Sequence, residues 1–384
     1  MAATLLGSAL TCVSAGYAMA AAVLTRRAST RAAPPAKAGE VRASVLKPLC
    51  GDEPRLYDNL ATLCRQSVTG QQIVCGVRDP DDPAIAVVRR LQQDFPGTDI
   101  QLVIDPRVHG SNLKVSNLIN LAAQARHDLL VVADSDIAVP PDYLAHVTAP
   151  LADAGVGIVT CLYRGRPVDA FWAKLGAQFI DDWFAPSVRI AHAGGSRRFA
   201  FGATIALRRD TLTQIGGFAS LSDRLADDFW LGELTRQAGL RTMLSDVVVS
   251  TDVTETRLSE LWTHELRWLR TIRSLNPAGF AFTFITFTWP MLALGLALSP
   301  TPALFAVALA GVIARGSTAG TLAAALRAPL RDMLLFAGWL CALAGTRVQW
   351  REQVMSVRDP QSAERTRSPS PLSSSNGITK KRPL

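Results

Sequence analysis

Two acidic residues, Asp134 and Asp136, follow a run of apolar residues at 129–133. An uninterrupted apolar run of this kind is typical of a strand covered on both faces of a sheet. Carboxylates at the end of such a strand are unfavourable unless they meet a cation or a reacting group. Paired carboxylates on a loop suit Mg²⁺ or Mn²⁺, with phosphate oxygens as the remaining ligands. The sequence therefore predicts a site for a divalent cation and a phosphate group after this strand.

Other polar residues follow neighbouring apolar stretches. Asp79 comes after the stretch 71–77, and a polar loop further along contains Lys114 and Asn117. Ligands of open α/β sheets bind beyond the carboxyl ends of the strands, so these side chains are candidates for the same site. Asp79 also lies beside Pro80, and the alternative interpretation is that it only shapes a turn.

Asp228 and three residues of a later segment complete the candidate set. Asp228 stands at the start of a predicted helix, where a carboxylate interacts favourably with the helix dipole. His264, Arg267 and Trp268 share one face of another predicted helix because of their spacing. Arg binds phosphate with paired hydrogen bonds, and Trp offers a flat apolar surface. An acid for a metal, an acid for a base and an Arg beside a Trp together indicate sugar transfer from a sugar nucleotide.

Strand and helix candidates alternate through the segment that carries these residues. The expected strands are 43–49, 71–77, 100–105 and 128–134, and the expected helices are 54–66, 83–95 and 114–125. Such alternation predicts an α/β fold with a mostly parallel sheet. The glycine-rich phosphate loops of Rossmann dehydrogenases and P-loop enzymes are missing, so neither class is expected. A further inner strand is expected in 199–209.

The first part of the chain predicts a membrane anchor. Thr4–Leu24 carries no charge and is long enough for a helix that crosses a bilayer core of about 30 Å. Arg26 and Arg27 follow this run, whereas a signal peptide carries its basic residues before it. By the positive-inside rule, the chain after this helix faces the cytoplasm. A cleaved leader with an "AMA" site is the alternative.

A second apolar block predicts further membrane segments. Gly279–Ala314 is uncharged, and "SPTP" at Ser299–Pro302 divides it into two short spans joined by a turn. A third stretch, Met333–Gly345, is short for a span and is expected to lie in the interface or to re-enter. The predicted organisation is an anchor at 1–27, a linker at 28–40, a catalytic domain at 41–277, membrane segments at 278–346 and a basic, partly disordered cytoplasmic tail at 347–384.

The overall composition favours a membrane partner over a nucleic acid. Of the 384 residues 48% are hydrophobic and only 19% are charged, with a net charge of +8. The basic residues flank the membrane segments and the tail, so attraction to anionic lipid explains them without nucleic acid. The six cysteines show no close pairing and no metal-ligand spacing, which is typical of reduced structural thiols.

Five short motifs occur in order along the chain. They are a "QD-x-x-DPA"-like stretch with Asp79, a "G-x-N-x-K-x-x-NL" loop over 110–118, a D-x-D-like element at Asp134–Asp136, an "(E/D)-D-(Y/F)" element with Asp228, and a "(Q/R)-x-x-R-W" element with Arg267 and Trp268. By these motifs residues 41–290 resemble the ceramide glucosyltransferase family and its bacterial relatives, the hopanoid-biosynthesis glycosyltransferases. His264 departs from the family pattern, which has Gln or Arg at that position.

The resemblance implies a membrane-anchored GT-A domain and an inverting transfer from a UDP-sugar. It assigns the metal to Asp136 and Asp134, and the proton acceptor to Asp228. It places Asp79, Lys114, Asn117, Asp134 and Arg267 on the nucleotide sugar. Trp268, Gly202, Thr204 and His264 fall on the acceptor side.

The resemblance also implies the substrates and the location. The expected reaction moves N-acetylglucosamine to a hopanoid, bacteriohopanetetrol, at the cytoplasmic face of a bacterial inner membrane. Glucosylation of ceramide is the alternative within the class, and a processive polysaccharide synthase is less favoured. A non-catalytic membrane scaffold that has kept the fold and a basic nucleic-acid-binding membrane protein are the alternatives from other classes.

Overall fold

The computed structural model describes residues 1–30, 39–345, 347–350 and 353–356. Its main sheet has eight strands in the order β3-β2-β1-β4-β7-β6-β8-β5. The strands are β1 (Ala43–Pro48), β2 (Gln72–Val77), β3 (Asp99–Ile104), β4 (Leu129–Val132), β5 (Ile137–Ala138), β6 (Val156–Pro167), β7 (Ile205–Arg208) and β8 (Arg241–Val253). The helices of this part are α2 (Leu56–Cys64), α3 (Ala84–Asp94), α4 (Leu113–Ala122), α5 (Tyr143–Thr148), α6 (Phe171–Gln178), α7 (Ala185–Ala193), α8 (Arg209–Gln214), α9 (Asp227–Gln237) and α10 (Leu258–Leu275). Short helical turns are η1 (Ala149–Ala152), η2 (Phe179–Phe184) and η3 (Phe218–Leu221).

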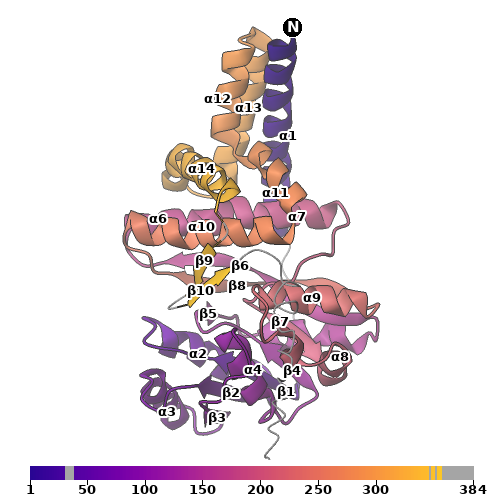
Figure 1. Cartoon of the computed structure of the whole chain (residues 1–384), viewed down its shortest axis with the longest axis vertical. Coiled ribbons are helices and arrows are strands. Elements are labelled where there is room, and N and C mark those ends of the chain that lie inside the picture. Colours follow the sequence, from indigo (N-terminus) through magenta and orange to yellow (C-terminus); the bar gives the residue numbers. More distant parts are fainter. Residues whose placement is uncertain (31–38, 346, 351–352, 357–384) are drawn as a thin grey trace, which may run out of the picture.

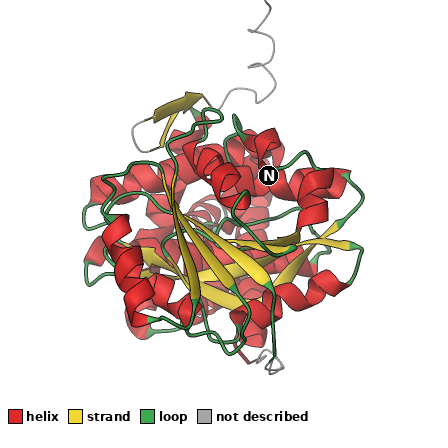
Figure 2. Ribbon diagram, turned by 90° about the horizontal axis from the view of Figure 1, so that it is seen from below, coloured by secondary structure: helices red, strands yellow, loops and turns green. Residues whose placement is uncertain are grey.

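The sheet confirms the predicted α/β class. Strands β1, β2, β3 and β4 are parallel to one another, as the alternation of strands and helices requires. Neighbouring residues of a strand face opposite cores: Val45 packs with α2, α3 and α5, and Leu46 packs with α4, α8 and α9. Figure 2 shows the twisted sheet between these two layers of helices.

The second half of the sheet is mixed. Strand β7 is antiparallel to both β4 and β6, whereas the two long strands β6 and β8 are parallel. The short strand β5 lies at the edge and pairs antiparallel with β8. The chain therefore returns to β4 from the opposite direction, and the residues just before β7 lie at the same edge of the sheet as the end of β4.

Three helices form a bundle that projects from the part of the protein that contains the main sheet. They are α1 (Ala2–Thr30), α12 (Thr288–Leu298) and α13 (Pro302–Thr318), as Figure 1 shows. The backbones approach closely where glycines meet: a Cβ added to Gly7 would lie 2.6 Å from the carbonyl oxygen of Gly295. Among the described residues, α1 is the one single helix that is long and apolar enough to cross a membrane, and there are up to three such spans if each of two bent helix pairs counts as one. The predicted hairpin is present, with its turn at 299–301.

The helix after the hairpin differs from the expectation. We predicted a short segment over 333–345, but α14 begins much earlier and covers Leu322–Leu343. It is bent by 117° from α13, and Figure 1 shows it lying across the base of the bundle. Its charged residues Arg331 and Asp332 are buried by contacts with the rest of the protein. The two pieces before the hairpin, α11 (Pro277–Phe282) and η4 (Thr283–Thr286), precede a bend of 73° into α12.

A layer of α6, η2, α7 and α10 separates this bundle from the sheet (Figure 1). Its core is aromatic and includes Phe179 and Trp183, which pack with Phe287 at the start of α12. The segment η2 is a π-helical turn between α6 and α7, a feature frequent at functional sites.

Two predicted boundaries fall partly outside the described residues. Helix α1 continues to Thr30, so it enters the predicted linker, and residues 31–38 are not described. In the predicted tail, β9 (Arg347–Trp350) and β10 (Gln353–Ser356) form an antiparallel pair, and 357–384 lie outside the described residues.

Candidate active site

The two aspartates that end β4 lie at the carboxyl edge of the parallel strands. Lys47, near the end of β1, is fully buried and donates a hydrogen bond from Nζ to the backbone oxygen of Asp134. Asp136 Oδ2 accepts a hydrogen bond of 2.6 Å from Thr251 on β8. Burial, the charge of Asp134 and that of Glu53 raise the pKa of Asp136 to about 6. Strand β4 is therefore followed by a carboxylate, that of Asp136, whose ionised form is disfavoured by burial and by neighbouring negative charges.

Lys114 joins this edge to the start of α9. Asn112 caps α4 by accepting a hydrogen bond from the backbone nitrogen of Val115, and this cap fixes the first turn that carries Lys114. Lys114 Nζ lies 2.6 Å from Asp134 Oδ1 and 3.2 Å from Asp227 Oδ2. Burial alone would lower the pKa of Lys114, but Asp134 and the acids of α9 together raise it. Lys114 therefore remains a cation at the centre of the site.

Asp228 is held on the strained first turn of α9. Ala226, just before the helix, has φ 57° and is the one residue other than glycine in the described chain with a positive φ. Asp228 Oδ2 accepts a hydrogen bond of 3.0 Å from the amide of Gly202, and its Oδ1 accepts one of 2.8 Å from the amide of Phe229. Burial, followed by the charge of Asp227, raises the pKa of Asp228 to about 6. A carboxylate with such a pKa is suited to accept a proton near neutral pH.

Gly202 lies between the two acidic groups. Its amide donates to Asp228, and a Cβ at this position would lie 2.8 Å from Asp134 Oδ2 and 3.4 Å from Lys114 Nζ. Glycine at this position therefore leaves room for the side chains of Asp134 and Lys114 next to the backbone. The resemblance had placed Gly202 at the acceptor, and the structure brings it to the carboxylates.

The side-chain oxygens at this edge are of the type that a divalent cation binds, but few protein side chains could act as its ligands. Within the described residues, neither Asp134 Oδ2 nor Asp136 Oδ1 takes part in a hydrogen bond, and both are hard carboxylate oxygens. The described part of the chain contains no group of three or more acidic, His or Cys side chains that could hold one metal ion. A cation at Asp134 and Asp136 would therefore take further ligands from a bound phosphate group.

Helix α10 brings the last motif to the site through an aromatic contact. The Trp268 ring lies 6.4 Å from the Tyr163 ring and 5.3 Å from the His264 ring. His264 Nδ1 pairs with Glu255. Burial acts to raise the pKa of Glu255, but the hydrogen bond with His264 and backbone hydrogen bonds lower it. Arg267 lies on the same helix and is half-buried. The three residues do share one side of the helix, as their spacing predicts.

Two predicted site residues, Asp79 and Asn117, lie at the end of β2 and make their hydrogen bonds there. Asp79 is exposed after β2, and its Oδ1 accepts a hydrogen bond of 2.9 Å from the amide of Asp81, which shapes a turn. Asn117 donates a hydrogen bond of 2.8 Å to the backbone oxygen of Gly76 and so braces the end of β2.

Thr204 is fully buried, and the structure does not bring its hydroxyl into the site. Its Oγ1 lies 3.0 Å from the hydroxyl of Tyr143 in the core. The chain turns between Phe201 and Thr204, where an isolated bridge forms, so Gly202 and Thr204 face different surroundings.

Two residues at this edge were missed by sequence reasoning. Lys47 was read as part of an apolar strand, and only its burial against Asp134 reveals its role. Tyr163 on β6 stands alone in its strand without a motif around it. Its ring lies 5.0 Å from Phe184 and 6.4 Å from Phe201 as well as beside Trp268.

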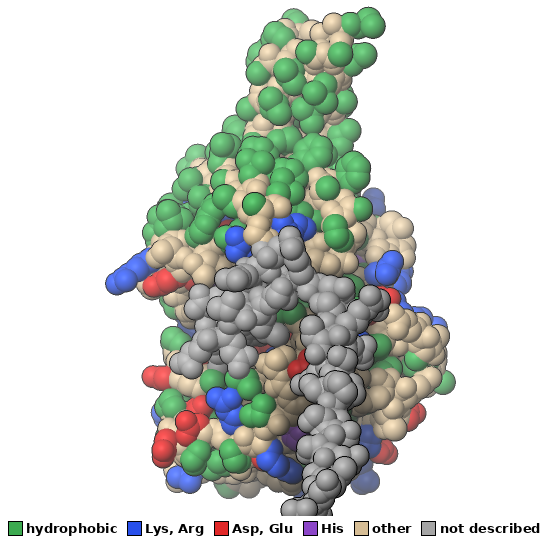
Figure 3. All heavy atoms as spheres, in the orientation of Figure 1, with side chains coloured by type: hydrophobic (Ala, Val, Ile, Leu, Met, Phe, Trp, Pro, Cys, Tyr) green, Lys and Arg blue, Asp and Glu red, His purple; other side chains and the backbone are tan. Residues whose placement is uncertain are grey.

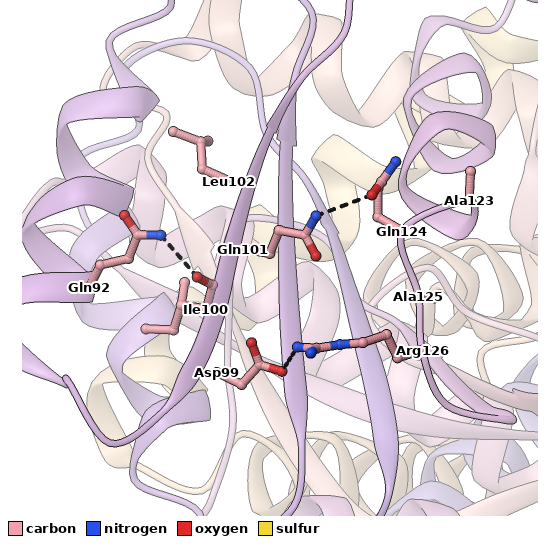
Figure 4. A pocket seen from close by; sticks show the side chains of 9 residues that line it. All are labelled: Gln92, Asp99, Ile100, Gln101, Leu102, Ala123, Gln124, Ala125 and Arg126. Carbon is pink, nitrogen blue, oxygen red and sulfur yellow. Dashed lines mark hydrogen bonds and ion pairs between the residues drawn. The ribbon is translucent and has the colours of Figure 1, made fainter.

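An open hollow at the opposite edge of the sheet has a different character. Figure 4 shows it at the start of β3, where Gln101 bonds Gln124 at 3.2 Å and Arg126 pairs with Asp99. Its polar side chains pair with one another at the amino end of the strand. It therefore lies away from the edge where α/β sheets bind their ligands.

Comparisons with known proteins agree with the resemblance. The sequence is similar over 231 residues to ceramide glucosyltransferase 3 of Caenorhabditis elegans, with 23% identity, 59% of this chain covered and 50% of the relative. A ceramide glucosyltransferase of Gibberella zeae is 28% identical over 125 residues, which cover 30% of this chain and 24% of that protein. The chain thus spans at most about half the length of these curated relatives.

A solved structure shows the same fold. The mannosyltransferase PcManGT from Pyrobaculum calidifontis, in complex with GDP-Man and Mn²⁺, matches with a TM-score of 0.52 at 20% identity, covering 89% of this chain and 99% of that chain. The fold is therefore of the GT-A type. The family described as glycosyl transferase family 21 matches residues 7–363, which is nearly the whole sequence. The chain belongs to glycosyl transferase family 21.

Proposed function

We propose that the protein is a membrane-bound glycosyltransferase that moves a sugar from a UDP-sugar to the hydroxyl of a membrane lipid, with inversion at the anomeric carbon. The observation that carries the proposal is the position of Asp228. This half-buried carboxylate is held by the amide of Gly202, next to the Lys114–Asp134 pair. A proton acceptor thus lies beside a phosphate-binding edge, as a one-step displacement requires.

In this reaction Asp228 takes the proton of the acceptor hydroxyl. The acceptor oxygen forms its bond to the anomeric carbon while the bond from that carbon to the diphosphate oxygen breaks, and UDP departs with the electron pair. The pKa of Asp228, about 6, leaves it ionised at neutral pH and therefore ready to accept the proton.

Cationic side chains of this chain would hold the nucleotide diphosphate. Lys114 is a permanent cation at the centre of the site, and Arg267 on α10 would bind the departing phosphates. Asp79 and Asn117, at the end of β2, would lie toward the uridine. A divalent cation held by Asp136 and Asp134 would supply positive charge to the leaving group.

The membrane side of the molecule supports a lipid acceptor. Figure 3 shows the bundle covered with hydrophobic side chains and the charged residues gathered below it. Helix α14 carries an exposed apolar stripe: Leu322 is 78% exposed and Leu326 is 74% exposed, with Leu330, Met333 and Leu340 continuing it. The stripe is typical of a helix that lies in the membrane interface. We propose a multi-pass inner-membrane protein with its catalytic domain at the cytoplasmic face.

Two acceptors are proposed within this function. Hopanoid polyols, with N-acetylglucosamine as the sugar, follow from the sequence resemblance, and the Ala and Arg richness of the chain fits a bacterial high-GC genome. Ceramide, with glucose as the sugar, is favoured by the names of the relatives reported above. The same carboxylate cluster would serve either reaction, because both acceptors present a hydroxyl at the membrane surface.

The experiment is a transfer assay with purified full-length protein in liposomes. UDP-glucose and UDP-N-acetylglucosamine are each supplied with ceramide or bacteriohopanetetrol in MnCl₂, and the lipids are analysed by mass spectrometry. A lipid heavier by one sugar is the expected product. Absence of product with every pair, or full activity after chelation and in Asp134→Ala/Asp136→Ala, contradicts the proposal.

A further inference from the structure

Tyr163 lies between the carboxylates of the site and the layer formed by α6, η2, α7 and α10. It lies on β6, whose neighbours in the sheet are β7 and β8, so its ring faces out of the sheet. The rings of Phe184, Phe201 and Trp268 surround it, at 5.0, 6.4 and 6.4 Å between centroids. These rings come from η2, the turn before β7 and α10. Three separate elements therefore fix the direction of this side chain.

The hydroxyl of Tyr163 makes no hydrogen bond to any residue that the structure describes, and the charges of three carboxylates act on it. The backbone of Tyr163 pairs with Val249 of β8, and its side chain is half-buried. Burial, followed by the charges of Asp228, Asp136 and Asp134, raises the pKa of Tyr163. The hydroxyl therefore stays protonated, and it can donate a hydrogen bond to a group that binds in this space. A bound ligand is the partner that this position leaves open.

The aromatic layer around Tyr163 continues to the membrane helices. Trp268 contacts Phe179, Phe179 contacts Trp183, and Trp183 stacks on Phe287 at the start of α12, with centroids 5.2, 5.1 and 6.0 Å apart. Phe287 in turn lies 6.3 Å from Phe336 on α14. An apolar molecule that comes from the bilayer thus meets an aromatic surface before it meets the acids.

From this arrangement we infer that Tyr163 is an acceptor-binding residue whose hydroxyl donates a hydrogen bond to the attacking hydroxyl group of the lipid. The inference rests on the proposed function and names the residue that orients its acceptor. The rings of Phe184 and Trp268 hold the apolar part next to the hydroxyl, and Asp228 receives the proton from the other side. The nucleotide is bound elsewhere, by Lys114 and the end of β4.

Tyr163→Phe tests the inference because it keeps the ring and removes only the hydroxyl. The full-length protein in liposomes is assayed with the acceptor and UDP-sugar that wild type uses. Three quantities are measured: kcat/KM for the acceptor, the Kd of UDP with MnCl₂ by calorimetry, and the slow hydrolysis of the UDP-sugar without acceptor. We expect kcat/KM for the acceptor to fall about tenfold or more, as for a lost hydrogen bond. The Kd of UDP and the hydrolysis rate should stay within about twofold of wild type.

The matched control is Tyr57→Phe, because the hydroxyl of Tyr57 bonds only Asp94 on the surface of α3. It should leave every quantity unchanged. Retained donor hydrolysis shows that Tyr163→Phe is folded. Should that variant fail to fold, Phe184→Leu removes the nearest ring and should raise the acceptor KM while UDP binding persists.

Two results overturn the inference. In the first, Tyr163→Phe transfers sugar at the wild-type rate. In the second, it loses UDP affinity or donor hydrolysis by the same factor as transfer, which would place Tyr163 on the donor. A wild-type protein that transfers no sugar to lipid overturns the proposed function instead, and the three outcomes are therefore distinct.

Discussion

Where α13 and α14 contact α10 and η2, the buried charged side chains lie in pairs of opposite charge. Arg331 on α14 makes two hydrogen bonds, of 2.6 and 2.5 Å, with Glu265 on α10. Arg315 on α13 lies 2.8 Å from Asp332 and 3.2 Å from Asp182. At the edge of the sheet, by contrast, acids outnumber cations: Lys47 and Lys114 face Asp134, Asp136, Asp227 and Asp228.

The difference separates a structural use of charge from a catalytic one. Paired charges at the junction are satisfied within the protein, so they fix how α13 and α14 sit on α10 and η2. Burial, followed by the charges of the neighbouring acids, raises the pKa of Asp136 and of Asp228 to about 6. Such a cluster is stabilised when a cation or a proton arrives, which is what a transferase site requires.

The largest expected effect is on the catalytic side of this comparison. Asp228→Asn keeps the shape of the side chain and removes its ability to accept a proton, so kcat should fall about 10²- to 10⁴-fold. Transfer to lipid is measured by mass spectrometry, and UDP binding by calorimetry should persist. Activity within tenfold of wild type would show that another group is the base.

A substitution at the junction of α14 and α10 should lower the stability of the protein. Arg331→Leu leaves Glu265 buried without its partner, and the free energy of unfolding should fall by about 3–5 kcal/mol. Chemical denaturation of the protein in detergent measures this change. The double variant Arg331→Leu/Glu265→Leu should recover most of the loss, because it removes both charges. If the single variant is as stable as wild type, the pair does not secure α14.

Gly202→Ala probes the close approach at the catalytic edge. Its Cβ would lie 2.8 Å from Asp134 Oδ2, so either the Asp134 carboxylate or the backbone at residue 202 must shift. A displacement of this size near reacting groups should lower kcat about tenfold to hundredfold. The control is Gly16→Ala in α1, because an added Cβ there meets nothing within 4 Å. Equal activity of the two variants would contradict the close contact.

The pH dependence follows from the raised pKa of Asp228. A raised pKa means that the carboxyl is protonated, and therefore inactive as a base, below about pH 6. With saturating MnCl₂, kcat/KM should be constant from pH 7 upward and should fall about tenfold per pH unit below 6. Initial rates from pH 4.5 to 8 measure the profile. A midpoint at the ordinary carboxylate pKa near 4 would contradict the burial of Asp228.

The smallest effect is expected at His264. Its Nδ1 pairs with Glu255, and the ring packs edge-on to Trp268. His264→Gln introduces the family residue and can still donate to Glu255, so transfer should change by no more than about threefold. His264→Leu, which cannot, should reduce activity further. Equal rates for both variants would show that the hydrogen bond to Glu255 has no role in transfer.

The sequence predicted the first half of the catalytic domain well because its signals are local. Apolar runs end in Asp79 and Asp134, and parallel strands bring such ends to one edge. The later strands β6 and β8 were not predicted, since neither is bounded by a chemical motif. The polar loop and the predicted helix start supplied Lys114 and Asp228 as candidates, and the resemblance, carried by five motifs in order, assigned their roles.

The membrane-side errors have a physical origin. Arg327, Arg331 and Asp332 interrupt the apolar run, so a search for uncharged stretches found only the last part of α14. In the structure Arg331 and Asp332 are buried in ion pairs, and a pairing with distant residues leaves no local signal. Tyr163 was missed for the same reason, because its neighbours Phe184, Phe201 and Trp268 come from later elements.

The contact of α1 with the hairpin has a consequence for biosynthesis. Gly7 meets Gly295, and Ala15 meets Gly311, so the helix made first by the ribosome packs on helices made much later. The main sheet can complete its own folding in the interval, before α1 meets the helices on which it packs. A bulky residue at Gly295 should therefore produce a chain that is inserted and has a folded sheet, yet remains open to quality-control proteases at its unassembled helices.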